Sequence, residues 1–127
     1  MKKIIKEIYS AFEGRLIGDD FMKEQVCITL SRMPEEIIEF VTTNCWFLAS
    51  IPDAYAFTFT GNDLRNQHLI FLSDELLYQE AEQISYTIAH EIGHVVLKHR
   101  NSVAYKQPKE EIKKQEKEAD EFARKYI

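Results

Sequence analysis

The hydrophobic and polar positions in the N-terminal part of the chain favour two helices and two extended segments. Apolar residues at helical spacing predict a first helix that ends near Gly14. Pro34 and the two glutamates after it are typical of a first helical turn, and an apolar stripe follows them. Residues 25–30 alternate weakly between polar and apolar, so we interpret them as a strand or an extended connection. Residues 45–51 are apolar and predict a buried strand.

The middle of the chain has the pattern of a β-hairpin followed by a long helix. Tyr55–Thr60 carries aromatic and β-branched residues in alternation, which favours a strand. Gly-Asn-Asp at 61–63 is typical of a turn, and His68–Leu72 predicts the returning strand. Ser73 and the acidic residues after it predict a helix start. The helical pattern then continues to about His99.

A last, strongly charged helix is predicted from Lys109 to Tyr126, after a polar loop and Pro108. Together these elements predict an α+β fold. It would have a small mixed sheet of about three or four strands, packed against a long helix and a C-terminal helix. A chain of 127 residues with no evident linker predicts one domain, residues 1–127.

Composition narrows the function classes and the compartment. The chain has 16 Lys and Arg against 21 Asp and Glu, a net charge of −5. This acidic balance argues against a nucleic-acid partner. No apolar run reaches the roughly 18 residues of a membrane span, and charged residues interrupt any signal peptide, so we expect a cytoplasmic protein with no membrane partner. We expect Cys27 and Cys45 to be buried free thiols, with one disulfide as the alternative.

The clearest candidate chemistry lies within the long predicted helix. His90-Glu91-Ile92-Gly93-His94 is an H-E-x-x-H sequence. Residues four apart share a helix face, so His90 and His94 can bind one Zn²⁺ ion while Glu91 serves as a general base toward a water. The apolar residues of this helix gather on the side opposite the histidines. A chance occurrence of the motif and an ordinary exposed polar face are the alternatives.

The last helix offers a third ligand. Glu116 interrupts its apolar stripe, and a carboxylate on an inward face is costly unless it is paired or bound to a metal. A charged residue at the edge of the stripe is the alternative. Asp120, one turn later, can accept the free N–H of a ligand histidine. The hypothesis is a metal site formed by His90, His94 and Glu116, with one coordination position left for water. These ligand types do not distinguish Zn²⁺ from other divalent metal ions.

These residues carry a family resemblance. His90–His94 followed by Glu116-Lys117-Glu118-Ala119-Asp120 resembles the gluzincin signature, H-E-x-x-H and then E-x-x-A-D. The resemblance covers about Tyr55 to Ile127. It is similar to the HtpX-like and CAAX-prenyl proteases with their one-domain relatives, the minigluzincins, and secondly to the ImmA/IrrE group. The strand at Asp53–Phe57 and the segment before the metal helix look more like the first group.

The resemblance implies a zincin-like fold and a zinc-dependent endopeptidase with one Zn²⁺ per chain and a peptide or protein substrate. It also implies latency, in which a terminal segment of the chain blocks its own cleft. The alternatives are cleavage of a helix-turn-helix repressor, as in the ImmA/IrrE group, and a non-catalytic zinc-stabilised interaction module. Candidate donors to the oxyanion are His99, Arg100 and Tyr105, although His99 falls on the apolar side and is better interpreted as a packed residue.

Overall fold

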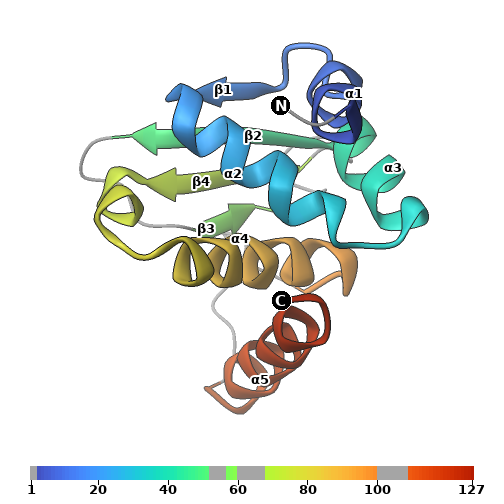
Figure 1. The fold of residues 1–127 in the computed structure, drawn as a ribbon. Helices are drawn as coiled ribbons and strands as arrows, with labels where there is room; N and C mark the ends of the chain where they lie inside the picture. The colour runs from blue at the N-terminus through green and yellow to red at the C-terminus, as the bar shows by residue number, and fades with distance from the viewer. Residues whose placement is uncertain (1–2, 52–56, 60–67, 100–108) are drawn as a thin grey trace.

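The structure is a computed structural model, and it describes residues 3–51, 57–59, 68–99 and 109–127. Its helices and strands follow one another as shown in Figure 1. In chain order they are α1 (Lys3–Ala11), β1 (Leu16–Gly18), α2 (Asp20–Ser31), α3 (Glu35–Asn44), β2 (Cys45–Ile51), β3 (Phe57–Phe59), β4 (His68–Ser73), the 3₁₀ helix η1 (Asp74–Tyr78), α4 (Ala81–Val96) and α5 (Lys109–Tyr126).

The strands form one mixed sheet in the order β1-β2-β4-β3. β1 and β4 run parallel to β2, with Phe47 opposite Leu16 and Ile70, whereas β3 runs antiparallel to β4. Alternate residues of the two central strands are fully buried, among them Phe47, Ile70 and Leu72. This period of two is what a sheet with one face on the core requires. The predicted α+β fold with a small mixed sheet is therefore confirmed.

Helices pack in succession from the sheet to α5 (Figure 1). α2 crosses in front of the strands and contacts α1 and α4, while α4 also contacts β3 and β4. α5 packs on α4 on the side away from α2. The core runs through these layers, from Ile5 and Phe12 near α1 to Ala123 on α5. The α4–α5 pair therefore lies at the end of the molecule opposite β1 and α1 (Figure 1).

Several predicted elements are confirmed by the structure. β2 and α5 occupy the ranges that the sequence predicted, and α3 begins after Pro34 as predicted. β3 and β4 pair as the two strands of a hairpin. α1 ends at Ala11, followed by a turn that reaches Gly14. The predicted turn at 61–63 and the ends of the predicted first strand, residues 55, 56 and 60, lie outside the described residues.

The extended segment predicted at residues 25–30 is wrong, because these residues belong to α2. Asp19 caps this helix by accepting a hydrogen bond from the backbone N–H of Met22. Two polar residues of α2, Gln25 and Thr29, are buried on its inner face, and the Thr29 hydroxyl donates to the Gln25 carbonyl oxygen. These polar residues hid the helical period that the buried Met22, Gln25, Val26, Thr29 and Leu30 define.

The single long helix predicted from Ser73 to His99 is also wrong. The segment divides into η1 and α4, separated by Gln79 and Glu80. The Gln79 N–H donates to the Leu76 carbonyl oxygen, which closes η1 as a 3₁₀ turn. α4 then begins at Ala81 and ends at Val96. The break leaves α4 free to take its own direction along the sheet.

Candidate metal centre

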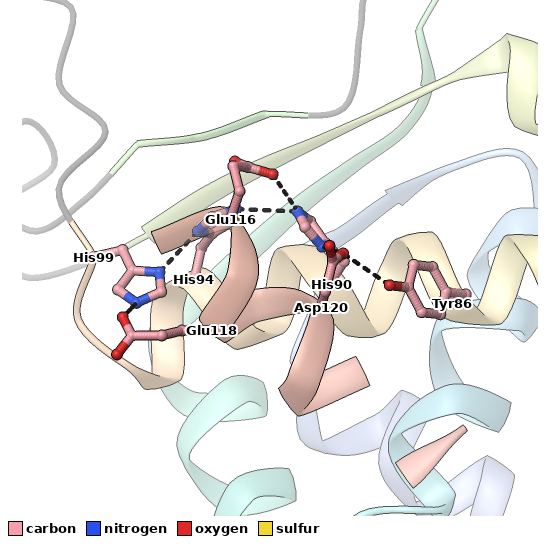
Figure 2. Close-up of polar contacts among 7 residues, drawn as sticks. All are labelled: Tyr86, His90, His94, His99, Glu116, Glu118 and Asp120. Carbon is pink, nitrogen blue, oxygen red and sulfur yellow. Dashed lines mark hydrogen bonds and ion pairs between the residues drawn. The ribbon is translucent and has the colours of Figure 1, made fainter. Parts of the chain in front are cut away.

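α4 directs its two faces at different parts of the molecule. Its core-facing side is apolar and fully or nearly fully buried: Ile84, Ile88, Ile92 and Val95. The histidines lie on the side that meets α5, where the His90 side chain is 15% exposed and the His94 side chain 10%. The helical period thus places both imidazoles in the α4–α5 interface (Figure 2), as the sequence pattern predicted.

α5 brings a carboxylate to the same point. The Glu116 Oε2 atom lies 2.9 Å from His90 Nε2, and Glu116 Oε1 lies 3.1 Å from His94 Nε2. The two Nε2 atoms are 3.2 Å apart. Residues separated by 26 positions in the chain therefore present three potential ligand atoms to one small volume (Figure 2).

Glu116 is less buried than the sequence pattern predicted. Its side chain is 54% exposed, and Ile112 on the same stripe is 42% exposed. The stripe is buried only from Ala119 onward, because the C-terminal half of α5 makes the contact with α4. Glu116 therefore lies at the rim of the interface, where its carboxylate meets both histidines and also faces water.

The spacing of these atoms suits a small divalent cation. Ligands about 2.0–2.1 Å from a tetrahedral Zn²⁺ are about 3.3 Å from one another. The separations of 2.9, 3.1 and 3.2 Å among the two Nε2 atoms and the two carboxylate oxygens of Glu116 are close to that value. Unshared electron pairs brought this close repel one another unless a proton or a cation lies among them. The residues His90, His94 and Glu116 could therefore hold a metal ion.

The second ring nitrogen of His90 is held by Asp120. The Asp120 Oδ1 atom lies 2.9 Å from His90 Nδ1 and also accepts a 2.7 Å hydrogen bond from the Tyr86 hydroxyl. The Tyr86 bond is the main cause that lowers the pKa of Asp120, and the same bond raises the pKa of Tyr86. An ionised Asp120 accepts a hydrogen bond from the Nδ1–H of His90, which leaves the Nε2 lone pair directed at Glu116 and His94.

The second ring nitrogen of His94 is held differently. His94 Nδ1 lies 2.9 Å from His99 Nδ1, and His99 Nε2 lies 2.9 Å from Glu118 Oε1. Burial lowers the pKa of His94 to about 4; Glu116 raises it in part, while His90 and His99 lower it further. His94 is thus neutral at pH 7, which is the form that binds a metal.

Close contact between α4 and α5 depends on Gly93. A Cβ atom at this position would lie 3.0–3.2 Å from atoms of the Phe122 side chain. The absence of a side chain lets Phe122 pack directly on the α4 backbone, next to His94. This contact sets how near α5 comes to the histidines.

The remaining predicted site residues are placed as follows. Glu91 follows His90 on α4 and is 7% exposed. His99 is 6% exposed and packs in the α4–α5 interface as a hydrogen-bonded residue. Arg100 and Tyr105, the other candidate oxyanion donors, lie outside the described residues. Cys27 and Cys45 are buried free thiols, as predicted.

The chain also matches a known protein family. Residues 62–127, just over half of the chain, match the family described as peptidase U49. The chain belongs to the peptidase U49 family. The U49 match runs through β4, α4 and α5, so it contains the two histidines and the glutamate that converge. Searches of curated proteins and of solved structures found no match.

Membership in a peptidase family gives the U49 chain a reaction class, hydrolysis of peptide bonds, and a substrate class, peptides or proteins. Among the described residues, no helix is both long and apolar enough to cross a membrane.

Two residues of the U49 site, Tyr86 and Glu118, were not named from the sequence, and the role of His99 as the partner of His94 was not foreseen. Tyr86 could have been found, because it precedes His90 by one helical turn on the same face. His99 and Glu118 gave no such signal. Their meeting depends on how the chain turns after α4 and on the angle at which α5 returns.

Proposed function

We propose that this chain is a gluzincin-type zinc endopeptidase in which His90, His94 and Glu116 hold one Zn²⁺ ion and Glu91 is the general base. The observation that carries this proposal is the convergence of two imidazole nitrogens and a carboxylate within 2.9–3.2 Å, supplied by two helices. Membership in a peptidase family supports the same reaction class. A bound Zn²⁺ would acidify a water molecule and polarise the scissile carbonyl group.

The assignment of Glu91 as the general base rests on its place next to His90 in the H-E-x-x-H sequence. Its 7% exposure on α4 is compatible with a carboxylate that lies inside the site. In the proposed mechanism this carboxylate accepts a proton from the attacking water and then gives it to the departing amine. Asp120 and Tyr86 hold the His90 ring in place during these steps.

The sheet offers a place for an extended substrate. Among the residues that the structure describes, β3 is the outermost strand on the side of β4, and it contacts α4. An extended peptide can add to such an edge through main-chain hydrogen bonds. We place the substrate along β3, with its scissile bond toward the histidines of α4.

Within the gluzincins, the resemblance favours the branch of the HtpX-like proteases and the minigluzincins. The hydrophobic core includes residues of all five α-helices, which supports the proposal that residues 1–127 form one domain. Cytoplasmic location and self-inhibition by a terminal segment remain predictions from the sequence. Glu116, with its side chain 54% exposed at the rim of the closely packed α4–α5 pair, leaves the proposed site in contact with solvent.

A cleavage assay on the Glu91→Gln variant tests the proposed function. The zinc-loaded chain should cleave an unfolded fluorescent protein substrate, and a chelator should stop the reaction until zinc is returned. Glu91→Gln should keep its zinc and lose about 10²–10⁴-fold in rate, because general-base catalysis contributes about that much. Glu82→Gln, an exposed change on the same helix, is the matched control and should retain wild-type activity.

Unchanged cleavage by Glu91→Gln would contradict the assignment of the general base. A wild-type chain that binds zinc and cleaves none of a broad set of unfolded substrates, with or without its termini trimmed, would instead favour the non-catalytic module.

A further inference from the structure

We infer that His99 and Glu118 act as positioning residues that fix the orientation and the protonated nitrogen of His94. This inference rests on the proposed function, since it concerns the residue that holds one of the ligand histidines. The observation is a continuous hydrogen-bonded chain from His94 Nδ1 to His99 Nδ1 and from His99 Nε2 to Glu118 Oε1, each step 2.9 Å (Figure 2).

The turn that ends α4 brings His99 to His94, where it joins this series of hydrogen bonds. The His99 N–H donates to the His94 carbonyl oxygen, and the Lys98 N–H donates to the Val95 carbonyl oxygen. These two bonds, with Lys98 at a φ of +59°, form a Schellman motif. Lysine adopts this left-handed conformation at an energetic cost. The motif returns the chain over the last helical turn, so His99 meets His94 through both backbone and side chain.

The direction of these hydrogen bonds follows from Glu118, the last residue in the series. A carboxylate only accepts hydrogen bonds, so Glu118 favours the form of His99 that carries its proton on Nε2. In a neutral His99 ring, Nδ1 is then an acceptor, and the proton between the two imidazoles belongs to His94 Nδ1. His94 Nε2 is consequently left with a free lone pair, directed at Glu116 and His90.

Burial strengthens the preference of His94 for a proton on Nδ1. The His94 side chain is 10% exposed and that of His99 is 6% exposed, so water competes little for their shared hydrogen bond. Glu118, with its side chain 42% exposed, lies at the solvent-facing end of these hydrogen bonds. Thus Asp120 fixes His90 directly, while Glu118 fixes His94 through His99.

Nitrogen NMR of the imidazole rings tests the inference without any metal or substrate. In the metal-free full chain at neutral pH, His94 should carry its proton on Nδ1 and His99 on Nε2. Glu118→Ala should remove the preference of His99, whereas Glu121→Ala, an exposed change on the same helix, should leave both rings as in the wild type. A wild-type His94 protonated on Nε2 would overturn the inference.

Zinc affinity, measured by competition with a chelator, gives the second readout. His99→Ala and Glu118→Ala should each lower the affinity about 10–100-fold, as loss of the partner of a ligand histidine does. Glu118→Gln should lose less than Glu118→Ala, because its amide oxygen still accepts from His99 Nε2. Glu121→Ala should bind zinc within twofold of wild type. Circular dichroism should show that each variant retains its helices.

The outcomes separate the two proposals. If the wild type binds zinc and both alanine variants bind it equally well, the role of His99 and Glu118 is wrong and the proposed function stands. If the wild type binds no zinc, the proposed function fails. The claim that the His94–His99–Glu118 hydrogen bonds serve a metal ligand then fails as well. If His99→Ala does not fold, the NMR result and the paired Glu118 variants still decide the inference.

Discussion

His90 and His94, the two proposed ligand histidines, differ in what holds their second ring nitrogen. His90 has a direct carboxylate partner in Asp120, whereas His94 reaches its carboxylate, Glu118, through another imidazole. In the proposed metal site, both arrangements would leave one nitrogen of each ring free to act as a ligand. Both carboxylates come from α5, the helix that also supplies Glu116. The geometry of the site is therefore sensitive to any residue that sets the distance between α4 and α5.

Gly93→Ala tests that sensitivity. Alanine has about 1 kcal/mol better helix propensity than glycine, but a Cβ atom 3.0–3.2 Å from Phe122 introduces overpacking of about 1–3 kcal/mol. We expect the overpacking to win, with a lower free energy of unfolding and weaker zinc binding as α5 moves outward. Denaturant unfolding and zinc titration measure the two effects. A variant that is more stable than the wild type and binds zinc equally well would show that Phe122 yields without moving α5.

The elements that carry the site are those with the strongest sequence signals. α5 begins and ends where its charged, amphipathic pattern predicted, and the apolar face of α4 lies on the core as its period predicted. α2 was missed because buried Gln25 and Thr29 look polar in sequence while lying on the inner face. β1 was missed because three residues carry too little pattern to distinguish a strand.

The end of α4 yields a prediction about its own stability. Lys98 has a φ of +59°, which suits glycine better than any residue with a side chain. Lys98→Gly should raise the free energy of unfolding by about 0.5–1 kcal/mol and leave the position of His99 unchanged. Leu97→Gly is the matched control: Leu97 has an ordinary φ of −84°, so glycine there should destabilise the chain. A destabilised Lys98→Gly variant would mean that the lysine side chain has a role outweighing its strained backbone.

At the scale of the whole molecule, the sequence predicted the fold class and the residues of the motif better than the connections between them. His90, His94, Glu116 and Asp120 follow from helical spacing, and the structure brings all four together. His99 and Glu118 depend on a helix-ending turn and on the return angle of α5, neither of which leaves a periodic pattern. The predicted long helix from Ser73 failed for a similar reason, because η1 has helix-forming residues yet ends in a 3₁₀ turn.

The two cysteines report on the integrity of the whole core. Cys27 on α2 and Cys45 on β2 are both fully buried, and burial is the main cause that raises the pKa of each thiol to about 12. The thiolate is the reactive form, and both thiols are buried, so the folded chain should react slowly with an alkylating reagent at pH 8. We expect labelling at this pH to follow global unfolding when denaturant is added.

The control for this experiment is the unfolded chain, in which both thiols should react at once at pH 8. If either cysteine of the folded chain reacted at the rate of free cysteine, the packing of α2 or β2 would be wrong.

The central claim is that two helices close a metal site from His90, His94 and Glu116. Its most direct test is the zinc content of the purified chain at a buffered free zinc concentration, compared with Glu116→Ala and with Glu121→Ala as the control on the same helix. We predict about one zinc per chain in the wild type and in Glu121→Ala, and loss of the zinc in a folded Glu116→Ala. One tightly bound zinc retained by Glu116→Ala, with wild-type affinity, would contradict the account.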